Sequence, residues 1–203
     1  MKKYLGFLIA AFMAACVTCA FAQGTVVFNN GTGLVNRLGY PSDVPMPKGG
    51  GEVQLYWAPA GTPYTPWNYL LPQAWFAANP GWSLGPVVGF TTSVPGRFDG
   101  GAITLSPLAP GGTIDYVVVG WTGNAQTMEQ ALATGAMLGV SGRFTSPTGN
   151  PTTVPPGFPV PLAGSFGGLT ITIPEPACFA LAAMGAASFL ALRSRDRKLP
   201  TNL

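Results

Sequence analysis

Short segments with alternating apolar and polar residues recur along the middle of the chain. Residues 52–57 and 169–173 alternate regularly, so the apolar side chains of each segment share one face of a strand. Residues 113–121 are apolar on both faces after their first positions, which predicts a central strand that is buried on both sides. Similar patterns occur in four further segments, residues 25–28, 86–91, 102–106 and 137–144. The chain is therefore predicted to form about seven strands.

Turns rich in glycine and proline separate these segments, and the Asn-Asn-Gly sequence at residues 29–31 is a strong turn signal. Evenly spaced short strands with such turns are typical of all-β domains. We predict an antiparallel β-sandwich or a jelly roll over residues 23–173. The alternation places Val118 and Ile171 in its core and Thr170 and Thr172 toward solvent.

One short helix is predicted after the central strand. Thr127 can cap its first turn, and Gly135 can end it. Met128, Ala131 and Leu132 share one face of this helix. Farther along, the six prolines of residues 146–161 predict an extended crossing connection.

The N-terminal residues have a different character. Two lysines precede the apolar residues 4–17, and Ala20 and Ala22 supply small side chains at the two positions that signal peptidase recognises. We predict a signal peptide over residues 1–22, which signal peptidase cleaves before Gln23.

The positions of the cysteines agree with export without disulfides. Cys16 and Cys19 lie within the predicted signal peptide and Cys178 lies near the C-terminus, so the central domain contains no cysteine. A competing interpretation is a lipoprotein signal, in which residues 13–15 precede Cys16 as the modified cysteine.

The C-terminal end consists of three successive parts. These are Pro174, Glu175 and Pro176, then the uncharged apolar residues 177–192, then the basic residues Arg193, Arg195, Arg197 and Lys198. As a helix the apolar part is about 24 Å long, slightly shorter than the hydrocarbon core of a bilayer, about 30 Å. It can cross the inner membrane if flanking residues enter the interface. The basic residues then hold the C-terminus in the cytoplasm, because clustered positive charge resists translocation.

This order of parts resembles the PEP-CTERM sorting signal of Gram-negative bacteria. The resemblance covers residues 174–203 and implies that an exosortase, a membrane enzyme similar to a transpeptidase, recognises Pro174, Glu175 and Pro176. It implies a transient anchor in the inner membrane, followed by delivery to the cell surface or the extracellular matrix. The alternative is an ordinary C-terminal anchor that has Pro-Glu-Pro only as a linker.

The central domain also resembles, more loosely, sandwich domains of exosortase-sorted proteins. The resemblance rests on the early Val-Phe-Asn-Asn strand, the strand containing residues 54–56, residues 109–113 before the central strand, and residues 142–145 after the helix. It supports the predicted fold and implies no activity.

The charge of the domain argues against nucleic acid as a partner. The basic residues of the domain are Arg37, Lys48, Arg97 and Arg143, and its acidic residues are Asp43, Glu52, Asp99, Asp115 and Glu129. Four positive charges minus five negative charges give a net charge of minus one, so the +3 of the whole chain comes from its two ends. The domain therefore lacks a basic patch that could bind a phosphate backbone.

The chain contains no histidine, which excludes Ser-His-Asp triads and zinc sites built on histidine. A pair among Glu52, Asp99, Asp115 and Glu129 could in principle hydrolyse a glycosidic bond. Asp43 with Asp99 could bind calcium, but no run of acidic residues supplies enough oxygen ligands. We therefore expect no catalytic residues, no cofactor and no metal.

The most unusual segment is residues 58–82, which we call the aromatic loop. It contains Trp67, Trp75 and Trp82 together with five prolines and has no charged residue. One interpretation is that its rings form a satellite core that covers the sheet. The other is that two or three rings remain exposed as a platform on which sugar rings stack, or which contacts another copy of the chain.

The leading functional prediction is an exported cell-surface or matrix protein that has a structural or interaction role and no catalytic activity. Only 8% of the residues are charged, against about 25% in ordinary domains, so there is little repulsion between copies. The alternative is a carbohydrate-binding module that recognises exopolysaccharide through the aromatic loop. A glycan-active enzyme is the third possibility.

Overall fold

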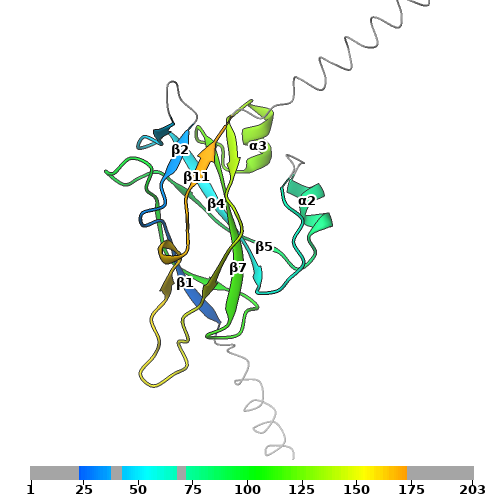
Figure 1. Cartoon of the computed structure of the whole chain (residues 1–203), viewed down its shortest axis with the longest axis vertical. Coiled ribbons are helices and arrows are strands. Elements are labelled where there is room, and N and C mark those ends of the chain that lie inside the picture. Colours follow the sequence, from blue (N-terminus) through cyan, green and yellow to red (C-terminus); the bar gives the residue numbers. More distant parts are fainter. Residues whose placement is uncertain (1–22, 38–42, 68–71, 173–203) are drawn as a thin grey trace, which may run out of the picture. The chain divides into compact units, whose positions relative to one another are not determined.

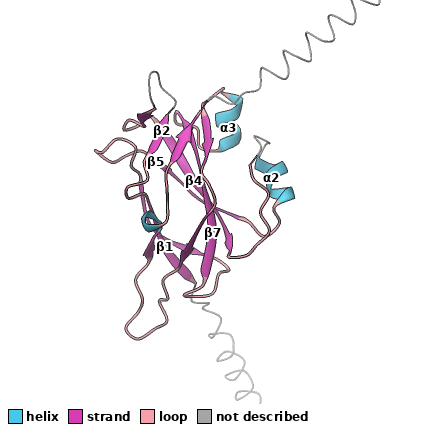
Figure 2. Cartoon of the chain, viewed as in Figure 1, coloured by secondary structure: helices cyan, strands magenta, loops and turns pink. Residues whose placement is uncertain are grey.

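The structure is a computed structural model that describes residues 23–37, 43–67 and 72–172 (Figure 1). The strands are β1 (Gly24–Asn29), β2 (Val35–Arg37), β3 (Val44–Pro45), β4 (Gly51–Pro59), β5 (Ser83–Gly89), β6 (Asp99–Leu105), β7 (Thr113–Thr122), β8 (Leu138–Val140), β9 (Phe144–Pro147), β10 (Val160–Pro161) and β11 (Leu169–Ile171). The helices are α2 (Pro72–Ala78), α3 (Met128–Ala133) and the short 3-10 helix η2 (Leu162–Gly164). Strands dominate the fold, which confirms the all-β prediction (Figure 2).

The strands form three sheets. A five-stranded sheet has the order β5-β4-β7-β8, with β9 also paired to β7. The other two sheets have three strands each, in the orders β10-β1-β6 and β11-β2-β3. β7 pairs with β4 along its length, from Gly51 opposite Thr122 to Pro59 opposite Ile114. The prediction that residues 113–121 form the central strand is therefore confirmed.

The main core lies between the five-stranded sheet and the two smaller sheets. Its residues are Val26, Phe28, Val35, Met46, Val53, Leu55, Trp57, Phe90, Phe98, Leu105, Leu108, Ile114, Tyr116, Val118, Leu162, Phe166, Leu169 and Ile171. The predicted strand phase is confirmed for Val118 and Ile171, which are buried, and for Thr170, which is exposed. Thr172 is half-buried rather than solvent-facing, because its backbone exchanges two hydrogen bonds of 2.8 Å with Leu138. Gly120 of β7 has a packing role: a Cβ atom there would lie 2.9 Å from Leu169 Cδ2 of β11.

The strands were predicted to pair only antiparallel, but two of the pairs are parallel. β10 runs parallel to β1, with Val160 opposite Val26, and β11 runs parallel to β2, with Leu169 opposite Val35. Both parallel pairs join strands far apart in the sequence. Parallel strands need a long connection, and residues 30–159 lie between β1 and β10.

The predicted turn at residues 29–31 does not form a hairpin. β1 pairs with β6 and β10, and the chain passes instead to β2 in another sheet. Asn30 is buried at this corner, where its Nδ2 donates to Gly33 O at 2.8 Å and to Gly96 O at 2.7 Å. Its Oδ1 accepts from Phe98 N at 2.7 Å. The side chain therefore replaces the backbone pairing that a hairpin would have supplied.

The predicted helix after the central strand is confirmed as α3. The Thr127 side chain accepts from Gln130 N at its start. At its end Gly135 has a φ of 71°, and Ala136 N donates to Ala131 O at 2.9 Å. A second short helix, α2, forms within the aromatic loop, with Pro72 at its first position, where a missing N–H costs nothing.

Within the described residues, no helix is long and apolar enough to cross a membrane. The predicted signal peptide, residues 1–22, and the predicted span, residues 177–192, lie outside the described part of the chain.

Candidate functional site

A second core covers the face of the five-stranded sheet that points away from the main core. Figure 1 shows α2 and α3 on this side, with β1 and β2 on the other. The residues of this outer core are Tyr56, Ala58, Trp75, Trp82, Val117, Val119, Trp121, Met128, Ala131 and Leu138. β7, in the middle of the five-stranded sheet, is thus buried on both faces, which explains why it is apolar on both sides.

Two tryptophans of the aromatic loop belong to this core. Trp75 is 1% exposed, with its ring centroid 5.5 Å from that of Tyr56, and Trp82 is 6% exposed. Their indole N–H groups donate to Thr65 O and Pro63 O, each at 3.0 Å. The satellite-core interpretation is therefore confirmed for both rings. Neither is available as a stacking platform, because the platform needs an exposed face.

Asn79 holds the aromatic loop together. It is 1% exposed, and its Nδ2 donates to Trp75 O at 2.9 Å. Its Oδ1 accepts from Thr65 N at 2.6 Å, which ties the end of α2 to the start of the loop. Sequence reasoning missed this residue. The available signal was an asparagine directly after a short helix and before Pro80, where a side chain can satisfy free backbone groups.

Trp67 differs from the other two tryptophans. Its ring stacks on Trp75 at 5.3 Å between centroids with an interplanar angle of 28°, but the side chain is only half-buried. Its indole N–H is shielded from water and has no hydrogen-bond partner within the described part of the chain. Of the three predicted platform residues, Trp67 is the one that remains at the surface.

Trp67 borders a cleft of about 350 Å³. Tyr64, Pro66 and Trp67 line it from the aromatic loop, and Val140, Ser141, Gly142 and Arg143 line it from the connection between β8 and β9. Sequence reasoning did not place Arg143 beside these rings, because about 75 residues separate them and only the fold brings them together.

Residues 140–143 can form the second wall of the cleft because a predicted strand is interrupted there. Residues 137–144 were expected to be continuous, but β8 ends at Val140 and β9 begins at Phe144. Ser141 causes the break: its Oγ accepts from Val118 N at 2.9 Å, and its own N donates to Val118 O at 2.9 Å. The side chain thus takes a place in the backbone ladder of β7, and Gly142 and Arg143 leave the sheet.

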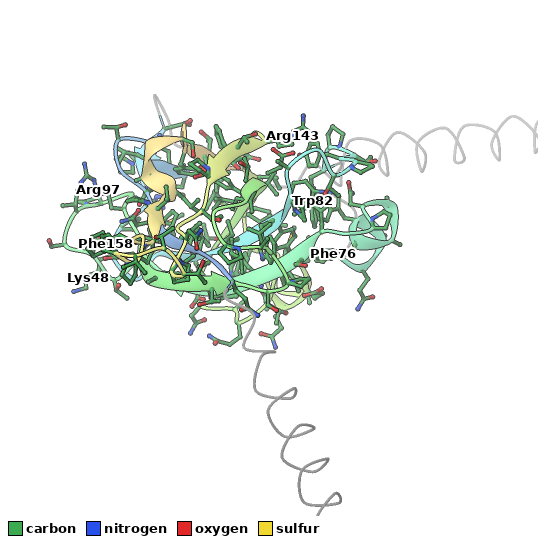
Figure 3. All side chains as sticks on the ribbon, turned by 90° about the horizontal axis from the view of Figure 1, so that it is seen from below. Lys48, Phe76, Trp82, Arg97, Arg143 and Phe158 are labelled. Carbon is green, nitrogen blue, oxygen red and sulfur yellow. The ribbon has the colours of Figure 1, made fainter. Side chains whose placement is uncertain are left out.

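Arg143 gives the cleft its positive charge. Its side chain is exposed, and its guanidinium carbon lies 5.4 Å from the centroid of the Tyr64 ring. This distance is within the range of a cation–π contact, which holds the guanidinium beside the ring. Figure 3 shows Arg143 at the same end of the molecule as Trp82, and far from Arg97.

The electrostatics of the cleft keep Tyr64 protonated. Burial raises the pKa of the Tyr64 hydroxyl, and the nearby Arg143 lowers that pKa only in part. At neutral pH the hydroxyl is therefore neutral and can both donate and accept a hydrogen bond.

The acidic residues considered for catalysis do not gather at this cleft. Asp115 is buried in β7, where one carboxylate oxygen accepts from Gly61 N at 3.0 Å and the other from Thr145 Oγ1 at 2.6 Å. Both oxygens thus hold neighbouring segments in place. Among the described residues, no three His, Cys, Asp or Glu side chains lie close enough together to hold a metal ion.

The predicted sorting residues lie outside the described residues. These are Ala20, Ala22, Pro174, Glu175, Pro176, Arg193, Arg195, Arg197 and Lys198. Gln23, the residue after the predicted cleavage point, is described, and its Nε2 donates to Ser106 Oγ at 2.9 Å.

Comparison with known proteins adds no identity. No family model matches the chain, and no curated protein or solved structure matches it.

Proposed function

We propose that this chain is an exported protein, sorted to the cell surface or extracellular matrix, whose β domain acts by non-covalent binding and has no catalytic activity. The observation that carries the proposal is the order of parts at the C-terminus: Pro174, Glu175 and Pro176, then the uncharged residues 177–192, then a basic cluster. An apolar segment followed by clustered positive charge can stop translocation and leave the domain outside. The two prolines beside Glu175 disfavour a helix or a central strand, which would keep this glutamate accessible to a membrane enzyme such as an exosortase.

The test of sorting is the fate of the full chain in the native host. In wild-type cells we expect a loss of mass at the C-terminus and delivery beyond the inner membrane, both visible by immunoblotting of cell fractions. Cells without the exosortase, or Glu175→Ala in normal cells, should retain the unprocessed chain at the inner membrane. Thr201→Ala is the matched control, because it leaves all three parts of the signal intact. Normal processing of Glu175→Ala would contradict the proposal.

The basic cluster allows an independent test. Deletion of residues 193–198 removes the charge that resists translocation, so the unprocessed chain should reach the medium. If this shortened chain is still retained and processed, the basic residues have no role in sorting.

Carbohydrate binding is a second candidate function, and one observation favours it. The cleft beside the aromatic loop presents the half-buried rings of Tyr64 and Trp67 next to an exposed arginine. Ligand sites commonly combine flat apolar surfaces with a few polar groups that fix orientation. Trp75 packs against Trp67, and Trp82 packs against Tyr64, so these two buried rings support the lining of the cleft rather than touch a ligand.

A further inference from the structure

We propose that the cleft lined by Tyr64, Trp67 and Arg143 binds an acidic sugar unit, a uronic acid within a polysaccharide, with its carboxylate on Arg143. The inference rests on the candidate carbohydrate-binding function and names the class of sugar.

The charge of the cleft selects an anionic ligand. Arg143 is the charged residue among the seven that line it. A guanidinium offers two parallel N–H groups that match the geometry of a carboxylate, and such charge-assisted pairs are stronger than neutral hydrogen bonds. The guanidinium carbon lies 5.4 Å from the centroid of the Tyr64 ring, and this contact holds the charged group beside the cleft.

The single positive charge of the cleft argues against nucleic acid as its ligand. Nucleic acids are held by several basic residues that together neutralise a run of phosphates. Here one arginine stands beside uncharged side chains, which suits a ligand that carries one negative charge per unit. A uronic acid residue has one carboxylate on an otherwise neutral ring.

The walls of the cleft suit a sugar ring. Tyr64 and Trp67 are flat, half-buried side chains that can pack against the apolar C–H face of a sugar. The Tyr64 hydroxyl, and the Trp67 indole N–H that lacks a partner within the described residues, supply polar groups for sugar hydroxyls. The indole N–H is shielded in the free protein, so a small rotation of the ring must accompany its use. Such a rotation would relieve an unpaired donor.

The cleft can accept a polymer as well as a single sugar. Arg143 and Pro66 at its rim are exposed, so neighbouring sugar units can continue into solvent on either side. Its volume of about 350 Å³ lies at the lower end of the usual range for ligand sites, about 300–1,000 Å³. This size fits one or two units rather than a long segment.

The experiment compares two forms of one oligosaccharide on the purified full chain. One form carries uronic acid carboxyl groups, and the other has the same length and linkage but has those groups reduced to hydroxymethyl groups. Binding is measured by calorimetry and by tryptophan fluorescence. We expect the acidic form to bind at least about tenfold more tightly than the reduced form.

Arg143→Gln should remove this preference, with a loss of about tenfold to hundredfold for the acidic form and little change for the reduced form. Arg97→Gln is the matched control, since it removes the same charge from an exposed arginine far from the cleft. Trp67→Leu keeps apolar bulk but removes the flat ring, so it should weaken both forms. Near-ultraviolet circular dichroism of each variant verifies that Trp75 and Trp82 remain packed.

The outcomes separate this inference from the function on which it rests. Equal binding of both forms overturns the acidic-sugar inference and leaves carbohydrate binding standing. Binding of neither form overturns both. An acidic preference that survives Arg143→Gln, or that Arg97→Gln removes equally, shows that the carboxylate is not bound at this cleft.

Discussion

The two faces of the five-stranded sheet are buried in different ways. On the inner face, side chains from three sheets interdigitate, with valine, leucine, isoleucine and phenylalanine dominating the core. On the outer face the cover is α3, α2 and the aromatic loop, and the rings of Tyr56, Trp67, Trp75 and Trp82 supply much of the contact. The inner cover is made of strands, whereas much of the outer cover is irregular chain.

This difference explains where a binding site can form. Regular strands satisfy their own backbone groups and pack to high density. On the inner side a cleft of about 290 Å³ opens only at an edge, between β5 and β6, where Trp57, Leu84 and Ile103 are among its lining residues. An irregular cover must satisfy its backbone through side chains, as Asn79, Trp75 and Trp82 do. The cleft lined by Tyr64, Trp67 and Arg143 lies where this irregular cover meets the residues between β8 and β9.

The largest expected effect tests whether the outer core contributes to stability. Trp75→Ala removes a fully buried ring, and we expect a loss of about 3–5 kcal/mol in the free energy of unfolding, because a large cavity remains. The measurement is urea unfolding followed by circular dichroism. Phe158→Ala is the control, since Phe158 is 89% exposed and should cost little. A loss below about 1 kcal/mol for Trp75→Ala would show that the aromatic loop is a removable cover.

A smaller truncation tests the inner core. Val118→Ala, at a residue 1% exposed in β7, should cost about 1–3 kcal/mol, because two buried methyl groups are lost. Thr170→Ser removes one methyl group at an exposed position of β11 and should be nearly neutral. The same unfolding experiment measures both, and equal effects would reject the strand phase.

The contrast between the faces also determines how much the sequence could predict. The inner core follows from period-two alternation, so β4, β7 and β11 were predicted with the correct face inward. Whether Trp75 and Trp82 are buried or exposed could not be predicted in this way, because an irregular loop has no periodicity that assigns a side chain to one face. Two interpretations of the loop therefore remained until the fold placed Tyr56 beneath it.

Other differences have local causes that the pattern does not encode. Ser141 interrupts a predicted strand because its hydroxyl competes with the backbone for Val118 N. The Asn30 side chain, by bonding Gly33, Gly96 and Phe98, replaces a hairpin with a corner between sheets. Both features depend on hydrogen-bond partners distant in sequence. The cleft depends on the interruption of the strand at Ser141.

A pH experiment compares the tyrosines of the two faces. Burial raises the pKa of the Tyr116 hydroxyl, on the inner face, to about 12, while a hydrogen bond with Ser165 lowers it in part. Because the folded pKa lies above the unfolded value of about 10, this group stabilises the fold below pH 10 and the contribution is lost as pH rises toward 12.

Tyr116→Phe should therefore lower stability at neutral pH, by about 1 kcal/mol for the lost hydrogen bonds to Leu162 O and Ser165, and should flatten the alkaline decline. Tyr56, on the outer face, also has a pKa raised by burial, so Tyr56→Phe should flatten the decline as well. Unfolding midpoints measured between pH 7 and pH 11 test both variants. A decline of unchanged steepness in both would show that ionisation of these residues does not limit alkaline stability.

The smallest expected effect concerns acidic residues near the outer face. Burial raises the pKa of the Glu52 carboxyl above its ordinary value of 4.5, so its ionised form is less favourable in the folded state. The favourable contribution of the protonated form is complete below the unfolded pKa and is lost as pH rises through the folded pKa. Glu52→Gln removes this dependence and should slightly stabilise the domain at pH 7, while leaving its stability at pH 4 almost unchanged.

Glu129→Gln should instead destabilise the domain at pH 7, with a loss of about 0.3–1 kcal/mol in the free energy of unfolding. The reason is that Glu129 lies in the first turn of α3, where negative charge is favourable. Thermal unfolding of both variants at the two pH values tests the contrast, and a destabilised Glu52→Gln at pH 7 would mean that a favourable partner of the carboxylate outweighs its burial.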